Sequence, residues 1–148
     1  MATTYKADNK TIIDAITPAT ILDPGTVGGN VRVMTDYVAF ATATGLPTTG
    51  DIIEVCGELP VGARVLDIMI WSNDATVTFT VGDYEDVDRY HAGTTANTLA
   101  HMAAIAGFNY EVDMTTTSTP DNQIILTAAG GTITTGKVIW FNVFYTVE

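Results

Sequence analysis

The sequence is poor in cysteine and in charge. Cys56 is the only cysteine among 148 residues, so an intramolecular disulfide and a zinc site built on paired cysteines are both excluded. Charged residues make up 16% of the chain, below the roughly one quarter that is usual. Apolar residues make up 47%, which is not the composition of a disordered chain. We therefore expect one ordinary domain with a substantial core and a weakly charged surface.

Positive charge is especially scarce. Six Lys and Arg stand against seventeen Asp and Glu, which gives a net charge of −11. The six basic residues are scattered singly along the chain, whereas binding to nucleic acid needs them clustered. We therefore expect no direct contact with nucleic acid. An anionic membrane would repel the chain for the same reason, so we expect no membrane partner.

Long apolar runs are also missing. No run approaches the ~20 residues that span a membrane, and the polar opening MATTYKADNK lacks the apolar segment of a signal peptide. We expect a protein that is made in the cytoplasm.

Short β-branched and aromatic runs, separated by Gly- and Pro-containing turns, dominate what is present. They predict an all-β fold, a jelly-roll-like antiparallel β-sandwich of about eight strands, with at most one short helix, within 94–106. We assign 31–148 to the sandwich and 1–30 to an N-terminal arm with at most one strand. Strands are expected in 31–43, 52–58, 63–82, 110–114, 123–129 and 137–147.

Two of these runs predict particular arrangements. Residues 63–82 indicate an antiparallel hairpin whose second arm alternates. Its inward residues are Val77, Phe79 and Val81, and its outward residues are Thr76, Thr78 and Thr80. Residues 137–147 (KVIWFNVFYTV) are apolar on both faces, which predicts a central strand that is covered on both sides or buried against a partner. We take Trp140 and Phe144 in this run as interface candidates.

The densest group of candidate site residues lies in 83–91, DYEDVDRYH. Calcium sites need about six to eight oxygen ligands and usually a glycine at the turn, and this stretch has no internal glycine. We favour a solvated turn in which Glu85 or Asp88 pairs with Arg89. The weak calcium candidates are Asp83, Glu85, Asp86 and Asp88.

No grouping in the chain is typical of an enzyme. His91 and His101 lie ten residues apart and lack a motif that would supply a third zinc ligand. Cys56 lies in the apolar run IIEVC, which favours a core position over a reactive thiol. Neither Ser72 nor Ser118 lies within G-x-S-x-G. We predict no catalytic residues, no cofactor and no resident metal.

The two tryptophans leave one alternative open. Trp71 and Trp140 could form a sugar-stacking platform, although large aromatic side chains lie more often in cores and interfaces. A carbohydrate- or ligand-binding β-sandwich module is therefore the alternative function.

Three short motifs follow one another between residues 50 and 147. The turn LPVGA (59–63) precedes a Thr-rich strand that ends in VGD (81–83), and the acidic stretch closes in Asp88, Arg89 and Tyr90. A small-residue segment and an aromatic last strand follow. This order resembles a family of tailed-bacteriophage head decoration, or cement, proteins with a jelly-roll fold.

The resemblance implies a virion structural protein without catalysis that binds and stabilises a phage capsid shell. The implied partners are the chain itself, as a homo-oligomer, and the major capsid protein, and the implied location is the virion. The DRY segment would be structural: Asp88 and Arg89 would pair at a strand end, and Tyr90 would pack beneath the turn.

Overall fold

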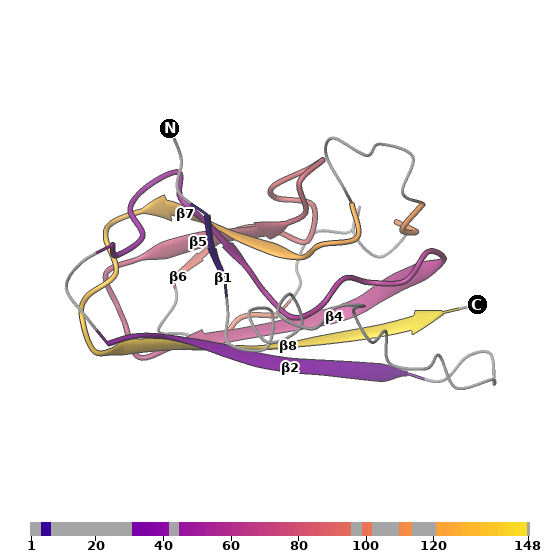
Figure 1. Ribbon diagram of the computed structural model, residues 1–148, viewed down its shortest axis with the longest axis horizontal. Helices are drawn as coiled ribbons and strands as arrows, with labels where there is room; N and C mark the ends of the chain where they lie inside the picture. Colours follow the sequence, from indigo (N-terminus) through magenta and orange to yellow (C-terminus); the bar gives the residue numbers. More distant parts are fainter. Residues whose placement is uncertain are drawn as a thin grey trace.

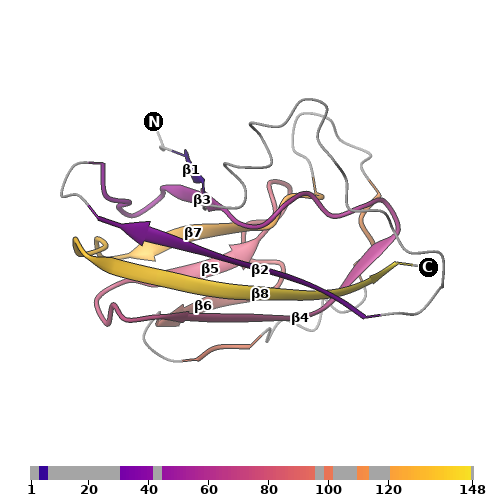
Figure 2. The ribbon, with the colours of Figure 1, turned by 60° about the horizontal axis from the view of Figure 1, so that its bottom comes forward.

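The computed structural model is a two-layered β-sandwich (Figure 1). It describes residues 4–6, 31–41, 45–95, 99–101, 110–113 and 121–147. One layer has five strands and the other has three. Turned by 60°, the molecule shows the three-stranded sheet in front of the strands of the other layer (Figure 2). The predicted all-β sandwich of about eight strands is confirmed, and the described residues contain no helix.

The five-stranded sheet has the strand order β1-β3-β7-β5-β6. Its neighbours pair antiparallel except at one edge, where β1 runs parallel to β3. The N-terminal β1 thus joins the sandwich, while residues 7–30 of the expected arm lie outside the described residues. The strands are β1 (Thr4–Lys6), β3 (Ile52–Glu54), β5 (Thr78–Gly82), β6 (His91–Thr95) and β7 (Ile125–Gly130).

The three-stranded sheet has β8 (Lys137–Val147) at its centre, between β2 (Arg32–Phe40) and β4 (Ala63–Ser72). The central position predicted for residues 137–147 is therefore confirmed. Both pairings are antiparallel, and β4 contains a bulge between Val65 and Asp67. Because of the bulge, Val65 and Ile68 both face the core, although their spacing in a regular strand would put them on opposite faces.

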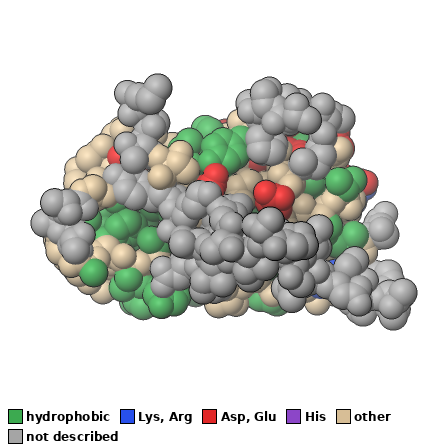
Figure 3. Space-filling view, viewed as in Figure 1, with side chains coloured by type: hydrophobic (Ala, Val, Ile, Leu, Met, Phe, Trp, Pro, Cys, Tyr) green, Lys and Arg blue, Asp and Glu red, His purple; other side chains and the backbone are tan. Residues whose placement is uncertain are grey.

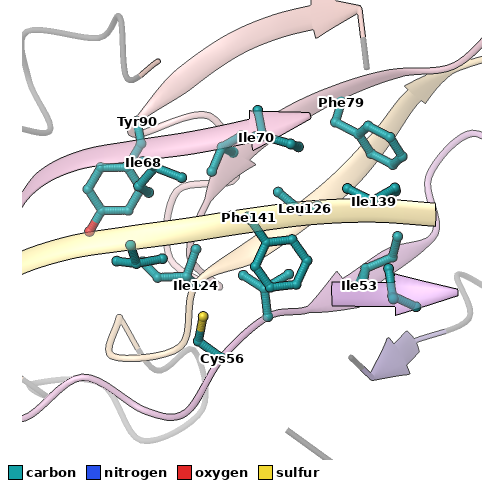
Figure 4. Close-up of a cluster of buried hydrophobic side chains, with 14 of the residues drawn as sticks. Ile53, Cys56, Ile68, Ile70, Phe79, Tyr90, Ile124, Leu126, Ile139 and Phe141 are labelled. Carbon is teal, nitrogen blue, oxygen red and sulfur yellow. The ribbon is translucent and has the colours of Figure 1, made fainter. Parts of the chain in front are cut away.

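The core lies between the two sheets (Figure 4). Phe79 from β5 and Phe141 from β8 are fully buried there, together with Ile70, Leu126 and Ile139. The alternation predicted for the Thr-rich strand is correct, because Val77, Phe79 and Val81 are buried and the intervening threonines are partly or fully exposed. Burial of one face is what selects this alternation.

The predicted hairpin in 63–82 is wrong. β4 belongs to the three-stranded sheet and β5 to the five-stranded sheet, so the chain crosses between layers at residues 73–77. Asp74 holds this crossing by accepting hydrogen bonds from the backbone N–H groups of Thr76 (2.9 Å) and Thr134 (2.7 Å). Both strands bury one face in the same core. The alternation of apolar and polar residues is therefore the same whether the two strands form a hairpin or lie in different sheets.

Two smaller expectations also change. Within 94–106, residues Thr94 and Thr95 end β6 and Ala100 forms a β-bridge with Ile70, whereas 96–98 and 102–106 lie outside the described residues. The described part of 110–114 is not a named strand, although Val112 exchanges two backbone hydrogen bonds with Gly62 and Ala63. Both segments therefore join the sandwich through short backbone pairings.

Candidate functional site

The acidic stretch after β5 is a tight turn organised by Asp83. The Asp83 carboxylate is fully buried and accepts hydrogen bonds from the backbone N–H groups of Glu85 (2.9 Å) and Asp86 (2.8 Å). Gly82 makes the turn possible, because a Cβ atom at this position would overlap the backbone of Asp86 and Val87. The VGD motif therefore has a structural explanation: its glycine admits the turn and its aspartate caps it.

Arg89 pairs with Asp83 rather than with Asp88. Its Nε lies 2.5 Å from Asp83 Oδ2, and its Nη2 lies 2.9 Å from Glu85 Oε2. Of the two partners expected for Arg89, Glu85 is present. Asp88 is exposed, and its backbone N–H donates a long hydrogen bond to Asp86 Oδ1 (3.4 Å). Asp83 takes the place of Asp88 because the turn directs its carboxylate inward.

The Arg89 guanidinium also connects the turn to Tyr110 and, through it, to Asp121. Its Cζ lies 3.4 Å from the centre of the Tyr110 ring, a cation–π contact. Tyr110 donates hydrogen bonds to Asp121 (2.6 Å) and Glu85 (3.0 Å). Burial, followed by these two carboxylates, raises the pKa of Tyr110. The network is structural, since it joins loops from distant parts of the chain.

The four calcium candidates do not converge on one point. Both carboxylate oxygens of Asp83 face Arg89, and Glu85 pairs with the same guanidinium. Asp86 and Asp88 remain close to each other, and their hydrogen bond and like charge raise the pKa of Asp88. Within the described residues, no group of three or more His, Cys, Asp or Glu side chains is placed to hold a metal ion.

The other candidate residues are dispersed. Tyr90 is buried in the core (Figure 4). Cys56 is buried too, and burial followed by the charge of Asp36 raises the pKa of its thiol, which suppresses the reactive thiolate. His91 Nδ1 accepts a hydrogen bond from the N–H of Gly93, while His101 Nδ1 lies 2.7 Å from Asp67 Oδ2. These positions form no catalytic grouping among the described residues.

The outer face of the three-stranded sheet exposes several large apolar side chains. Tyr37, Trp140 and Trp71 lie directly beside one another across β2, β8 and β4. They are 45%, 40% and 40% exposed. Val33 is also exposed, and beside it lies the half-buried Phe144. We call the row Tyr37–Trp140–Trp71 the aromatic row.

The two tryptophans of the row pack against each other. Their ring centroids lie 4.7 Å apart, with the planes tilted by 30°. Each ring therefore covers part of one face of the other, and less open ring face remains for a ligand to stack on. Apolar surface at their exposed edges is suited to contact with another protein.

The sequence indicated Trp140 and Phe144 but not the whole surface. Tyr37 and Val33 are missing from the expectation, although the alternation in residues 31–40 carries the signal. Their face became identifiable only through the register that places Tyr37 opposite Trp140 and Val33 opposite Phe144. Among the described residues no helix is long and apolar enough to span a membrane.

Comparison with known proteins gives two similar structures. A chain of the cyanophage Pam1 capsid asymmetric unit is 30% identical, with a TM-score of 0.61, over 90% of this chain and 96% of that chain. A chain of the acid-stable capsid of the Helicobacter pylori bacteriophage KHP30 is 13% identical, with a TM-score of 0.42, over 82% and 90%. No family model and no curated protein matches the sequence.

Proposed function

The chain belongs to the family of the matching chain in the cyanophage Pam1 capsid, and on this basis we propose that it is a virion structural protein. The observation that carries the proposal is the extent of the similarity, 30% identity over 96% of a chain from a capsid. A similarity of this length covers the whole sandwich rather than one shared motif.

We further propose that it is a decoration, or cement, protein that binds and stabilises the capsid shell without catalysis or a cofactor. The exposed aromatic row and Phe144 supply an apolar surface of the kind that marks protein interaction sites. We place the protein on the outer face of the shell, because packaged DNA would repel its net charge of −11. Its partners are then the major capsid protein and further copies of itself, with no contact to nucleic acid or membrane.

The strand order supports the finer assignment to a jelly roll. Successive strands β2, β3, β4 and β5 alternate between the two sheets, and β8 returns to lie between β2 and β4. The bridge between Ile70 and Ala100 extends the three-stranded sheet on the far side of β4. Two four-stranded layers, β3-β7-β5-β6 and β2-β8-β4 with residues 99–101, then have the connectivity of two Greek keys. We also propose that the protein is made in the host cytoplasm and assembled into the virion, as a structural protein of the capsid would be.

The carbohydrate-binding alternative has weaker support. Exposed tryptophans on the outer face of a sheet favour it, but Trp71 and Trp140 each cover part of one face of the other ring instead of presenting it to a sugar. A sugar-binding module should also be stabilised by its ligand in proportion to ligand concentration. Absence of such stabilisation across a panel of phage-receptor polysaccharides is the expected result.

The test is co-sedimentation with phage heads that lack the protein. Purified protein is mixed with undecorated heads and pelleted, and the bound amount is measured against protein concentration. We expect saturable binding that survives moderate salt, because apolar contacts are not screened. Heads that already carry the protein are the control and should bind little more. Failure to bind undecorated heads at any salt concentration would overturn the proposed role.

A further inference from the structure

Asp67 adjoins the apolar surface that is proposed to contact the shell. On the outer face of the three-stranded sheet, Phe144 of β8 lies directly between Val33 of β2 and Asp67 of β4. Figure 3 shows apolar side chains gathered at the lower left, where β4 ends and β8 begins, which is the end that carries the aromatic row. Side chains directly opposite each other on neighbouring strands are in contact distance. A partner that covers the aromatic row and Phe144 therefore also covers Asp67.

Asp67 is in contact with His101, a side chain that can change its charge. Nδ1 of His101 lies 2.7 Å from Oδ2 of Asp67. The neighbouring Ala100 holds His101 in this place, because it exchanges two backbone hydrogen bonds with Ile70 of β4 (2.9 and 3.0 Å). The side chains of His101 and Asp67 are 54% and 32% exposed. The contact is thus fixed to the edge of β4 but hydrated in the free protein, where an ion pair contributes little to stability.

The other charges on this face are constant near neutral pH. At the outward positions of β2, β4 and β8, the side chains that carry charge at neutral pH are Arg64 and Asp67. Arg64 pairs with Glu111 (2.5 Å), so that contact is neutral. Within 92–109 the sequence has no ionisable side chain besides His101. Histidine is the side chain whose charge ordinarily changes between about pH 5 and pH 8. Among the described residues of this face, the group that titrates near neutral pH is therefore His101.

We propose that docking of the shell on this face is coupled to the uptake of a proton from solvent by His101. With neutral His101 the contact carries the negative charge of Asp67, whereas protonated His101 balances that charge. Docking removes the contact from water, and an ionised carboxylate is costly to bury unless a cation compensates it. Docking therefore favours protonated His101, and the affinity for the shell rises as the pH falls. The inference concerns the regulation of the shell contact and rests on the proposed function.

The test is binding to undecorated heads at two pH values, about pH 6 and about pH 8, on either side of the ordinary titration of histidine. Purified protein is titrated against a fixed amount of heads and pelleted, and the dissociation constant is obtained at each pH. Uptake of one proton on binding changes the dissociation constant by at most about tenfold for each pH unit. We expect a dissociation constant that is at least about fivefold lower at the lower pH.

Two substitutions should act in opposite directions. His101→Gln keeps a polar side chain that cannot take up a proton, so at both pH values it should bind as weakly as the unchanged protein does at the higher pH. Asp67→Asn removes the charge that needs compensation, so at the higher pH it should bind about as tightly as the unchanged protein does at the lower pH. Loss of a merely structural contact would weaken binding in both variants, because each removes one partner of the same pair.

His91→Gln is the matched control. His91 is the second histidine of the chain, and it lies in β6, in the five-stranded sheet. This variant should keep the full pH dependence of binding. Circular dichroism at both pH values checks that each variant is folded, and Asp67→Asn tests the inference independently if His101→Gln does not fold.

The outcomes separate this inference from the proposed function. Saturable binding that is equal at the two pH values, or a pH dependence that survives in His101→Gln, overturns the inference and leaves the decoration role intact. An Asp67→Asn variant that binds no more tightly than the unchanged protein at the higher pH overturns it as well. Absence of binding at both pH values overturns the decoration role and the inference together.

Discussion

Asp83 and Arg89 form an ion pair that is almost completely removed from solvent. Arg89 Nε lies 2.5 Å from Asp83 Oδ2, and the two side chains are 11% and 0% exposed. Because Asp83 also accepts two backbone hydrogen bonds, the pair holds the turn after β5 against the core. Removal of one partner from such a pair leaves the other charge buried without compensation.

Replacement of Arg89 should therefore be strongly destabilising. We expect Arg89→Met to lower the free energy of unfolding by about 3–5 kcal/mol in urea titrations. Glu85→Gln is the matched control, because it removes the exposed arm of the same network and should cost about 1 kcal/mol or less. Similar losses in the two variants would mean that the buried pair is not the dominant interaction.

A side chain at Gly82 should be poorly tolerated. Its Cβ would overlap the backbone of the 86–88 turn, which cannot move without breaking the hydrogen bonds to Asp83. We expect Gly82→Ala to lower the free energy of unfolding by about 3 kcal/mol or more. Gly130→Ala in β7 is the control, since its Cβ would meet only the hydroxyl of Thr78. An equally mild effect of both changes would show that the turn can shift.

Asp74 should make the protein sensitive to acid. Burial by itself would raise the pKa of Asp74, but hydrogen bonds from Thr76 and Thr134 outweigh it and lower the pKa from 3.8 to about 2. A lowered pKa in the folded state contributes stability above the unfolded value, and this contribution is lost as the pH falls from about 4 toward 2. The difference corresponds to about 2 kcal/mol.

Urea unfolding at a series of pH values measures this contribution. Asp74→Asn should lower stability near neutral pH and flatten the fall between about pH 4 and pH 2. Glu58→Gln, at an exposed position, is the control and should leave the profile unchanged. A profile in which Asp74→Asn keeps the full slope would assign the acid sensitivity to other carboxyl groups.

Calcium should not stabilise the acidic turn specifically. Asp83 and Glu85 already pair with Arg89, so binding of a calcium ion would have to break these contacts. We expect calcium to shift the melting temperature no more than magnesium does at equal concentration. A larger calcium shift that disappears in Asp86→Asn or Asp88→Asn would establish a calcium site.

The class of fold and the faces of individual strands could be predicted from the sequence. Val77, Phe79 and Val81 are buried as predicted, because the period of two is a local property of any strand with one face against a core. The apolar character of both faces of residues 137–147 likewise placed β8 at the centre of its sheet. A central position means that neighbouring strands, here β2 and β4, pair with both edges of β8.

The pairing of strands and of charged side chains depends on the tertiary structure and could not be predicted from the sequence. β4 lies beside β8, more than sixty residues later in the chain, and not beside β5, because a local pattern carries no information on distant partners. For the same reason the alternation in residues 31–40 did not reveal that Tyr37 lies opposite Trp140. Arg89 pairs with Asp83 rather than with its neighbour Asp88, because the close packing of the turn over Gly82 sets the direction of each carboxylate.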